Sequence, residues 1–146
     1  MDLTTIRPFT PSISTEVIED LIHRLKRTRL PEAETVEDWS QGVPLGYQAE
    51  LLDYWTNDYD FARLEQRLGA FDNFITDIDG VEIHFIHKRS QHSAATPLLI
   101  THGWPGSVLE YLDLLDALTD PTQDGGSPDD AFHVVLPALP GFGFSG

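Results

Sequence analysis

PLLITHGWPGS, residues Pro97–Ser107, is the stretch that decides the fold predicted for this sequence. Its apolar run, Leu98–Ile100, is short and continuous, which is typical of a strand buried on both faces in a parallel sheet. Two glycines and a proline then favour a tight turn, because glycine adopts backbone conformations closed to other residues and proline fixes φ. The stretch therefore predicts a strand, a turn and a helix, and it directs attention to the edge of the sheet where the strand ends.

The segment after this turn carries the signs of a helix start. Ser107 is expected to be the N-cap, and Glu110, three residues later, can complete a capping box. Apolar residues then recur at helical spacing on one face, namely Val108, Tyr111, Leu112, Leu115 and Leu118. Backbone N–H groups at such a turn can stabilise the negative oxygen that develops when an acyl or ester carbonyl is attacked. The same turn also occurs without catalysis in open α/β sheets, so its spacing alone leaves both interpretations open.

The charge balance argues against two classes of partner. The formal net charge is −15, from 24 acidic and 9 basic residues, and nucleic acids and anionic membranes are themselves negative. Cysteine is absent, which excludes disulfides and thiolate metal sites and fits a reducing compartment. The start lacks an apolar stretch of signal-peptide length, and no run approaches the ~18 apolar residues of a membrane span. We therefore expect a soluble cytoplasmic protein with no nucleic-acid, membrane or metal partner.

The length suggests an incomplete enzyme. The chain has 146 residues, which suits one domain, whereas α/β sheet enzymes usually need considerably more. It stops in the loop sequence PGFGFSG. We therefore expect the amino-terminal portion of a longer protein, with a split gene product as the alternative.

The first part of the chain predicts three short helices. One begins near Ser14 and is stopped by Pro31, with acidic residues in its early turns and basic residues in its late ones, as the helix dipole favours. Trp39 is interpreted as a packing anchor. A second helix carries an aromatic stripe, expected in the core, at Tyr47, Leu51, Tyr54 and Trp55. A third helix starts near Asp60 and ends at Gly69, interpreted as the residue that follows a helix in the left-handed conformation.

The middle of the chain predicts a β-hairpin, because the apolar period changes to two. Residues 74–78 and 81–85 flank Asp79-Gly80, a two-residue turn that favours such a hairpin. His84 and His87 lie three residues apart, so on a strand they point to opposite faces and a shared metal site is not expected. They are interpreted as surface or cross-strand residues.

Later segments complete the predicted architecture. Asp120–Asp130 is rich in turn formers and acids without the spacing of a calcium loop, and it is interpreted as a solvated connection. Phe132–Leu136 predicts another buried strand. The order hairpin, strand, helix, strand indicates the α/β fold class, preceded by a separate helical section.

The residues also resemble one family. HGWPGS is similar to the H-G-x-P motif of α/β-hydrolase-fold enzymes, and its Trp-Pro-Gly-Ser version most resembles the microsomal-type epoxide hydrolases. The resemblance implies an amino-terminal helical meander over residues 1–72, followed over residues 73–146 by the first strands of an incomplete α/β-hydrolase core domain. The residues that carry it are Thr28-Arg29-Leu30-Pro31, Trp39, Tyr54-Trp55, Asp79-Gly80, Ile83-His84-Phe85, His102–Ser107 and Pro140–Ser145.

The resemblance also implies a reaction. In that family an Asp on a nucleophile elbow attacks an epoxide carbon, and a water activated by a His hydrolyses the resulting ester to release a vicinal diol. Tyrosines of a lid donate protons, and no cofactor takes part. This chain contains no G-x-D-x-G or G-x-S-x-G elbow. We therefore predict the amino-terminal portion of an epoxide hydrolase that detoxifies small apolar epoxides, inactive without the nucleophile, base and lid.

The part of the family's machinery that maps onto this chain is the oxyanion turn. The resemblance implies that the backbone N–H of Trp104 is one oxyanion donor, and that His102 and Pro105 shape the turn. It does not make His102 the general base. The aromatic rings expected to border the substrate pocket belong to Trp104, Phe142 and Phe144.

Two other functions stay open at this stage. The turn alone is compatible with another α/β-hydrolase, such as an esterase or a dehalogenase, and a short chain can also be a non-catalytic interaction module. An apolar strand at Leu98–Ile100 without a neighbour on its outer side would be a template for association, so self-association of the isolated chain is expected.

Overall fold

The structure, a computed structural model, describes residues 5–146. These residues form two compact units. One unit is Ser12–Glu65, which is helical, and the other combines the described part of Met1–Pro11 with Gln66–Gly146, which contains the sheet. No helix within residues 5–146 is both long enough and apolar enough to cross a membrane.

The first helix of the helical unit, α1 (Thr15–Leu25), starts where the sequence predicts and ends earlier. The Ser14 hydroxyl accepts a hydrogen bond from the Val17 N–H at 3.3 Å, which confirms the N-cap. The predicted continuation to Pro31 is wrong. The Arg27 and Thr28 N–H groups donate, at 3.0 Å each, to carbonyls only three residues back, and this tighter turn ends the helix.

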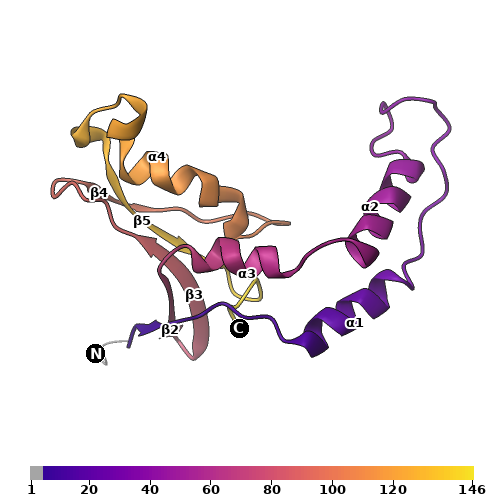
Figure 1. The fold of residues 1–146 in the computed structure, drawn as a ribbon, viewed down its shortest axis with the longest axis horizontal. Coiled ribbons are helices and arrows are strands. Elements are labelled where there is room, and N and C mark those ends of the chain that lie inside the picture. Colours follow the sequence, from indigo (N-terminus) through magenta and orange to yellow (C-terminus); the bar gives the residue numbers. More distant parts are fainter. Residues whose placement is uncertain (1–4) are drawn as a thin grey trace. The chain divides into compact units, whose positions relative to one another are not determined.

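The second helix, α2 (Leu45–Asn57), has an exposed aromatic stripe. Figure 1 shows α1 and α2 side by side, and the two helices contact each other. The predictions of a core stripe and of Trp39 as a packing anchor are wrong, because both are exposed; the Trp39 ring lies edge-on to the Tyr47 ring, with centroids 5.2 Å apart. A pair of short helices has no third layer under which such a stripe could be buried.

The third helix, α3 (Ala62–Gly69), begins near Asp60 as predicted, where the Asp60 carboxylate accepts from the Ala62 N–H at 3.0 Å. Its predicted end is wrong in one respect, because Gly69 is the last helical residue and does not adopt a left-handed φ. The Asn73 amide replaces a glycine cap. Its Nδ2 donates to the carbonyl oxygens of Leu68 and Phe71, both at 2.8 Å.

The sheet has five strands in the order β1-β2-β3-β5-β4. Strands β4 and β5 are parallel, and the other neighbours are antiparallel, which confirms the α/β class (Figure 1). The hairpin is confirmed as well, because Asp79 and Gly80 have φ of 53° and 86°, the positive values that a two-residue turn of this type needs. The strands are β1 (Arg7–Pro8), β2 (Asn73–Ile78), β3 (Val81–Lys88), β4 (Thr96–Leu99) and β5 (Phe132–Pro137).

One face of this sheet carries the core. The α-helix α4 (Leu115–Thr119), which follows the 3-10 helix η1 (Val108–Leu114), packs against β5, and Figure 1 shows α4 lying against that strand. The predicted helix is thus present, but its first part is 3-10, a geometry common at helix starts. The most buried apolar side chains are Ile86, Leu115, Val134 and Leu136.

Strand β4 is the edge of the sheet, which corrects the prediction that Leu98–Ile100 is buried on both faces. The Leu99 side chain is 64% exposed. Within residues 5–146, β4 pairs only with β5, so its outer side has no neighbouring strand. A continuous apolar run indicates that a strand can be buried, but it does not indicate that neighbouring segments cover it. The expected burial fails here because the outer edge of β4 is open.

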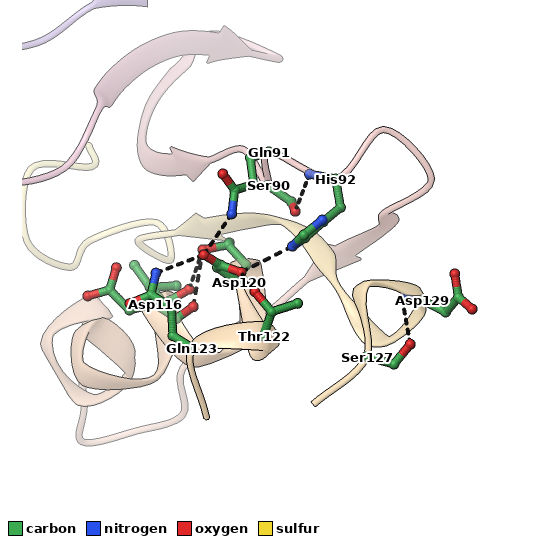
Figure 2. Close-up of polar contacts among 11 residues, drawn as sticks. Ser90, Gln91, His92, Asp116, Asp120, Thr122, Gln123, Ser127 and Asp129 are labelled. Atoms are coloured by element: carbon green, nitrogen blue, oxygen red, sulfur yellow. Dashed lines mark hydrogen bonds and ion pairs between the residues drawn. The ribbon is translucent and has the colours of Figure 1, made fainter. Parts of the chain in front are cut away.

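The connection from Asp120 to Asp130 is anchored, which corrects its interpretation as a merely solvated loop. It contains the 3-10 helices η2 (Pro121–Asp124) and η3 (Pro128–Asp130). Figure 2 shows the Asp120 carboxylate at the centre of a cluster that receives hydrogen bonds from Gln123, Thr122, His92 and Gln91. These donors, Gln123 first, hold the pKa of Asp120 well below its usual range.

Candidate functional site

The candidate site lies where the two parallel strands end. Residues 100–107, which contain the HGWP turn (His102–Pro105), follow β4, and the β5 loop (residues 138–146) follows β5. Because the carboxyl ends of parallel neighbours meet at the same edge of a sheet, the two segments are adjacent. This edge is where open α/β sheets bind their ligands.

His102 joins the two segments. Its side chain is buried, with 3% of the residue exposed. The Leu139 N–H donates to His102 Nε2 at 3.0 Å, which leaves the hydrogen on Nδ1, and Nδ1 lies 3.1 Å from the Gly103 carbonyl oxygen and donates to it. Both ring nitrogens are therefore occupied by backbone partners, so the imidazole acts as a structural bracket and has no nitrogen left to accept a proton from water.

The middle of the HGWP turn is open. Trp104 is 84% exposed, and its peptide bond to Pro105 is cis. No atom of residues 5–146 accepts a hydrogen bond from the N–H groups of Gly103, Trp104 or Gly106. The turn therefore presents unused backbone donors, of which the predicted Trp104 donor is one.

The end of the turn is fixed by a close approach. A Cβ built on Gly106 would lie 2.1 Å from Glu110 Oε1 and 2.7 Å from the Gly103 carbonyl oxygen, so any other residue there would force the carboxylate and the backbone of the turn to shift. The predicted capping box is confirmed, since the Ser107 N–H donates to Glu110 Oε1 at 3.0 Å and the Leu109 N–H donates to Ser107 Oγ at 3.2 Å. The turn is thus held at His102 on one side and at the Ser107 capping box on the other, with the unused donors of Gly103, Trp104 and Gly106 between them.

The aromatic residues expected at the pocket separate into different surroundings. Phe142 packs edge-on against the His102 ring, with centroids 5.1 Å apart. Phe144 packs instead against Phe9 and His84, with centroids 5.1 and 5.5 Å away. The structure therefore brings Phe142 to the turn, leaves the Trp104 ring in solvent, and places Phe144 in a cluster at the start of the sheet.

His84 corrects the sequence interpretation in part. It is a cross-strand residue, opposite Ile75, but it is not at the surface, since only 1% of it is exposed. Its Nε2 lies 2.9 Å from Asn73 Oδ1, and because the Asn73 amide nitrogen donates elsewhere, Nε2 is the donor. Burial lowers the pKa of the His84 imidazole, which keeps it neutral.

Sequence reasoning missed two groups at this site. The Leu139 contact is made by a backbone N–H, and no residue type signals it. The Ser145 hydroxyl accepts from the His84 N–H at 3.0 Å and donates to the Ala138 carbonyl at 2.8 Å. Ser145 belongs to Pro140–Ser145, one of the stretches that carry the family resemblance, but its hydrogen bonds were not predicted.

A concavity of the sheet unit lies elsewhere. It has a volume of about 550 Å³ and is bordered by apolar residues of β4 and by His87, Arg89 and His133, with no residue of the HGWP turn. Burial, then the nearby Arg89 and His133, lower the pKa of His87. We place the candidate site at the turn because unused backbone donors are found there, at the edge where β4 and β5 end. In the part of the chain that the structure describes, no three His, Asp or Glu residues gather as a metal site would require.

Comparison with known proteins identifies relatives along nearly the whole chain. Residues 6–111 match the family described as "Epoxide hydrolase N terminus". A Stigmatella aurantiaca protein, provisionally named an epoxide hydrolase, is 56% identical over 140 residues, and epoxide hydrolase 1 of Oryctolagus cuniculus is 37% identical over 145 residues. These matches cover 96% and 97% of this chain and 32% of each relative, so the chain spans about a third of their length.

Solved structures give the same result for the fold. The epoxide hydrolase of Aspergillus niger matches with a TM-score of 0.78 at 30% identity, over 97% of this chain and 37% of that one. The juvenile hormone epoxide hydrolase of Bombyx mori matches with a TM-score of 0.76 at 34% identity, over 97% and 38%.

Proposed function

We infer a role in epoxide hydrolysis for this chain, which belongs to the epoxide hydrolase N-terminus family. We propose that it supplies the helical section and the first core strands of an epoxide hydrolase, including one donor of the oxyanion hole. The observation that carries the proposal is the HGWP turn, which is fixed at both ends and keeps unused N–H groups at the edge where β4 and β5 end.

The proposed reaction has two steps. A carboxylate from outside residues 1–146 attacks an epoxide carbon, the carbon–oxygen bond breaks, and the released alkoxide takes a proton from an acid. This leaves a hydroxyalkyl ester on the enzyme. Water then attacks the ester carbonyl, and the negative oxygen of the tetrahedral intermediate accepts a hydrogen bond from the Trp104 N–H. Collapse of the intermediate passes one proton of that water to the departing oxygen, which releases the vicinal diol and regenerates the carboxylate, and the other proton restores the acid.

His102 has an indirect role in this proposal. Because its ring nitrogens bind the Gly103 carbonyl and the Leu139 N–H, it holds the turn in place and transfers no proton. A donor that is already oriented costs no rearrangement when charge develops on the carbonyl oxygen, and this is where such sites gain their effect. The Trp104 and Phe142 rings beside the turn suit an apolar epoxide.

The proposal is tested with the product of the complete reading frame and a single turnover of an aryl epoxide in ¹⁸O-labelled water. An ester intermediate requires that the first diol molecule carries an unlabelled oxygen from the carboxylate, with the label entering the protein. Residues 1–146 alone should form no diol. Hydrolysis of an aryl ester without any turnover of the epoxide would move the assignment to an esterase.

A further inference from the structure

The hydrogen-bond ladder between β3 and β5 ends in an unusual way. Ala138, the first residue after β5, donates its N–H to the His84 carbonyl at 2.9 Å. In a regular antiparallel pair the two residues would exchange both bonds, and the His84 N–H would return a bond to the Ala138 carbonyl. Instead the Ser145 hydroxyl stands between them, accepting from the His84 N–H at 3.0 Å and donating to the Ala138 carbonyl at 2.8 Å.

The position of the Ser145 hydroxyl between His84 and Ala138 determines the path of the chain after β5. With its carbonyl bound by the hydroxyl, Ala138 leaves the sheet, and the next residue, Leu139, points its N–H at His102 Nε2. The β5 loop then returns on itself, since the Gly141 N–H donates to the Gly146 carbonyl at 2.8 Å and the Gly146 N–H donates to the Glu82 carbonyl at 2.9 Å. One hydroxyl therefore stands at the base of the loop whose first residues contact the HGWP turn.

The residue that donates to this hydroxyl is itself held by hydrogen bonds. His84 is buried and bound through Nε2 to Asn73, whose amide in turn binds the carbonyls at the end of α3. A continuous series of hydrogen bonds thus runs from the end of α3 through Asn73, His84 and Ser145 to the backbone at Ala138. One residue further, Leu139 continues it to His102.

We propose that Ser145 is a positioning residue for the oxyanion turn, acting through Ala138–Leu139 and His102. The catalytic part of this proposal rests on the proposed function; the geometric part does not. Loss of the hydroxyl leaves the Ala138 carbonyl and the His84 N–H without their shared partner. The start of the β5 loop then shifts, the Leu139 bond to His102 weakens, and the HGWP donors lose their direction.

The geometric part is tested by NMR on the 146-residue chain labelled with ¹⁵N. The wild type should show a scalar coupling between the Leu139 amide nitrogen and His102 Nε2 across their N–H···N hydrogen bond. Ser145→Ala should reduce or abolish that coupling, and Ser145→Thr, which keeps the hydroxyl, should retain it. Ser127→Ala is the matched control, because it removes a hydroxyl that caps η3 and takes no part in this series; it accepts from the Asp129 N–H at 3.2 Å (Figure 2).

The catalytic part is tested with the product of the complete reading frame. Ser145→Ala should lower kcat for an aryl epoxide by about 10-fold to about 10²-fold, less than outright loss of an oxyanion donor, with KM little changed. Ser145→Thr should restore most of the rate, and Ser127→Ala should behave as wild type.

Each outcome of these experiments supports or overturns the positioning role of Ser145. Absence of the coupling in the wild type, or a Ser145→Ala protein with unchanged coupling, overturns the positioning role. If Ser145→Ala does not fold, the test rests on the wild type and on Ser145→Thr. A coupling in the wild type, with coupling and rate retained in Ser145→Thr, then supports the role. A folded Ser145→Thr protein that has lost the coupling and the rate overturns it. If the complete protein turns over no epoxide, the proposed function fails while the NMR result still judges the hydrogen-bond series.

Discussion

Replacing Gly106 by Ala should destabilise the chain by more than any comparable change in the same turn. The added Cβ would lie 2.1 Å from Glu110 Oε1 and 2.7 Å from the Gly103 carbonyl oxygen. The carboxylate can rotate away, but it then gives up the Ser107 N–H and breaks the capping box. The backbone carbonyl can move only with the whole turn.

The magnitude follows from these contacts. Overpacking a fixed site costs about 1–3 kcal/mol, and loss of a cap adds about 1 kcal/mol. The lower entropy of an unfolded Ala chain returns about 0.4–1 kcal/mol. The net loss in the free energy of unfolding should be roughly 1–3.5 kcal/mol, or several degrees in Tm for a chain of this size.

The matched control is Gly103→Ala, because a Cβ at Gly103 meets no atom within 4 Å. Neither glycine has a positive φ, so the comparison isolates the steric contact. Both variants are compared with wild type by urea unfolding followed by far-UV circular dichroism, and Gly106→Ala is repeated in a Glu110→Ala background, which should relieve only part of the loss. Equal stability of Gly103→Ala and Gly106→Ala would refute the claim that the turn is fixed at Gly106.

Three further predictions concern the turn, the Asp120 cluster and the sheet edge. In the product of the complete reading frame, Pro105→Ala should lower epoxide turnover more than Trp104→Phe, because it loosens the direction of the Trp104 N–H. Complete loss of an oxyanion donor costs ~10²–10³ in rate. Equal small effects of the two substitutions would show that the turn is merely structural. Because hydrogen bonds hold the folded pKa of Asp120 below its ordinary 3.8, its contribution to stability is present above about pH 4 and is lost as the pH falls further. Asp120→Asn should therefore flatten the acid limb of stability measured against pH, and an unchanged limb would contradict the role of the cluster. We propose that the isolated chain self-associates through β4, and that self-association increases with salt because charge repulsion is screened over ~8 Å. Leu99→Lys should reduce the self-association seen by sedimentation. A monomer at every salt concentration would argue against edge pairing.

Local signals predicted the parts of the fold that depend on a few neighbouring residues. Asp79-Gly80 specified the hairpin, and Ser14 and Ser107 specified helix starts, because in each case the turn or cap is made within four residues. The failures share the opposite property. The exposure of Leu99 and the burial of His84 depend on which distant segments pack nearby, and periodicity carries no information about them.

The candidate site divides along the same line. The HGWP residues could be selected from their sequence, since glycine and proline restrict the turn directly. The groups that hold the turn through His102 could not be selected from the sequence. They are a backbone N–H from Leu139 and a hydroxyl from Ser145, some forty residues later in the chain. The end of α3 is a similar case. A glycine is the residue expected to end the helix there, but the Asn73 side chain binds the carbonyl of Leu68 instead.

The strand order has a consequence for how the protein is made. Strand β5 is the last of the five to be synthesised, yet it lies between β3 and β4. During translation the β2–β3 hairpin and β4 must wait for it, and at 5–20 residues per second the interval between Leu99 and Phe132 takes roughly 2–7 s. For that time Ile86 and the apolar residues of β4 lack Val134 and Leu136, which join them in the finished core. The nascent chain therefore passes through a stage in which two open sheet edges are available to chaperones or to misfolding, and β5 closes both at once.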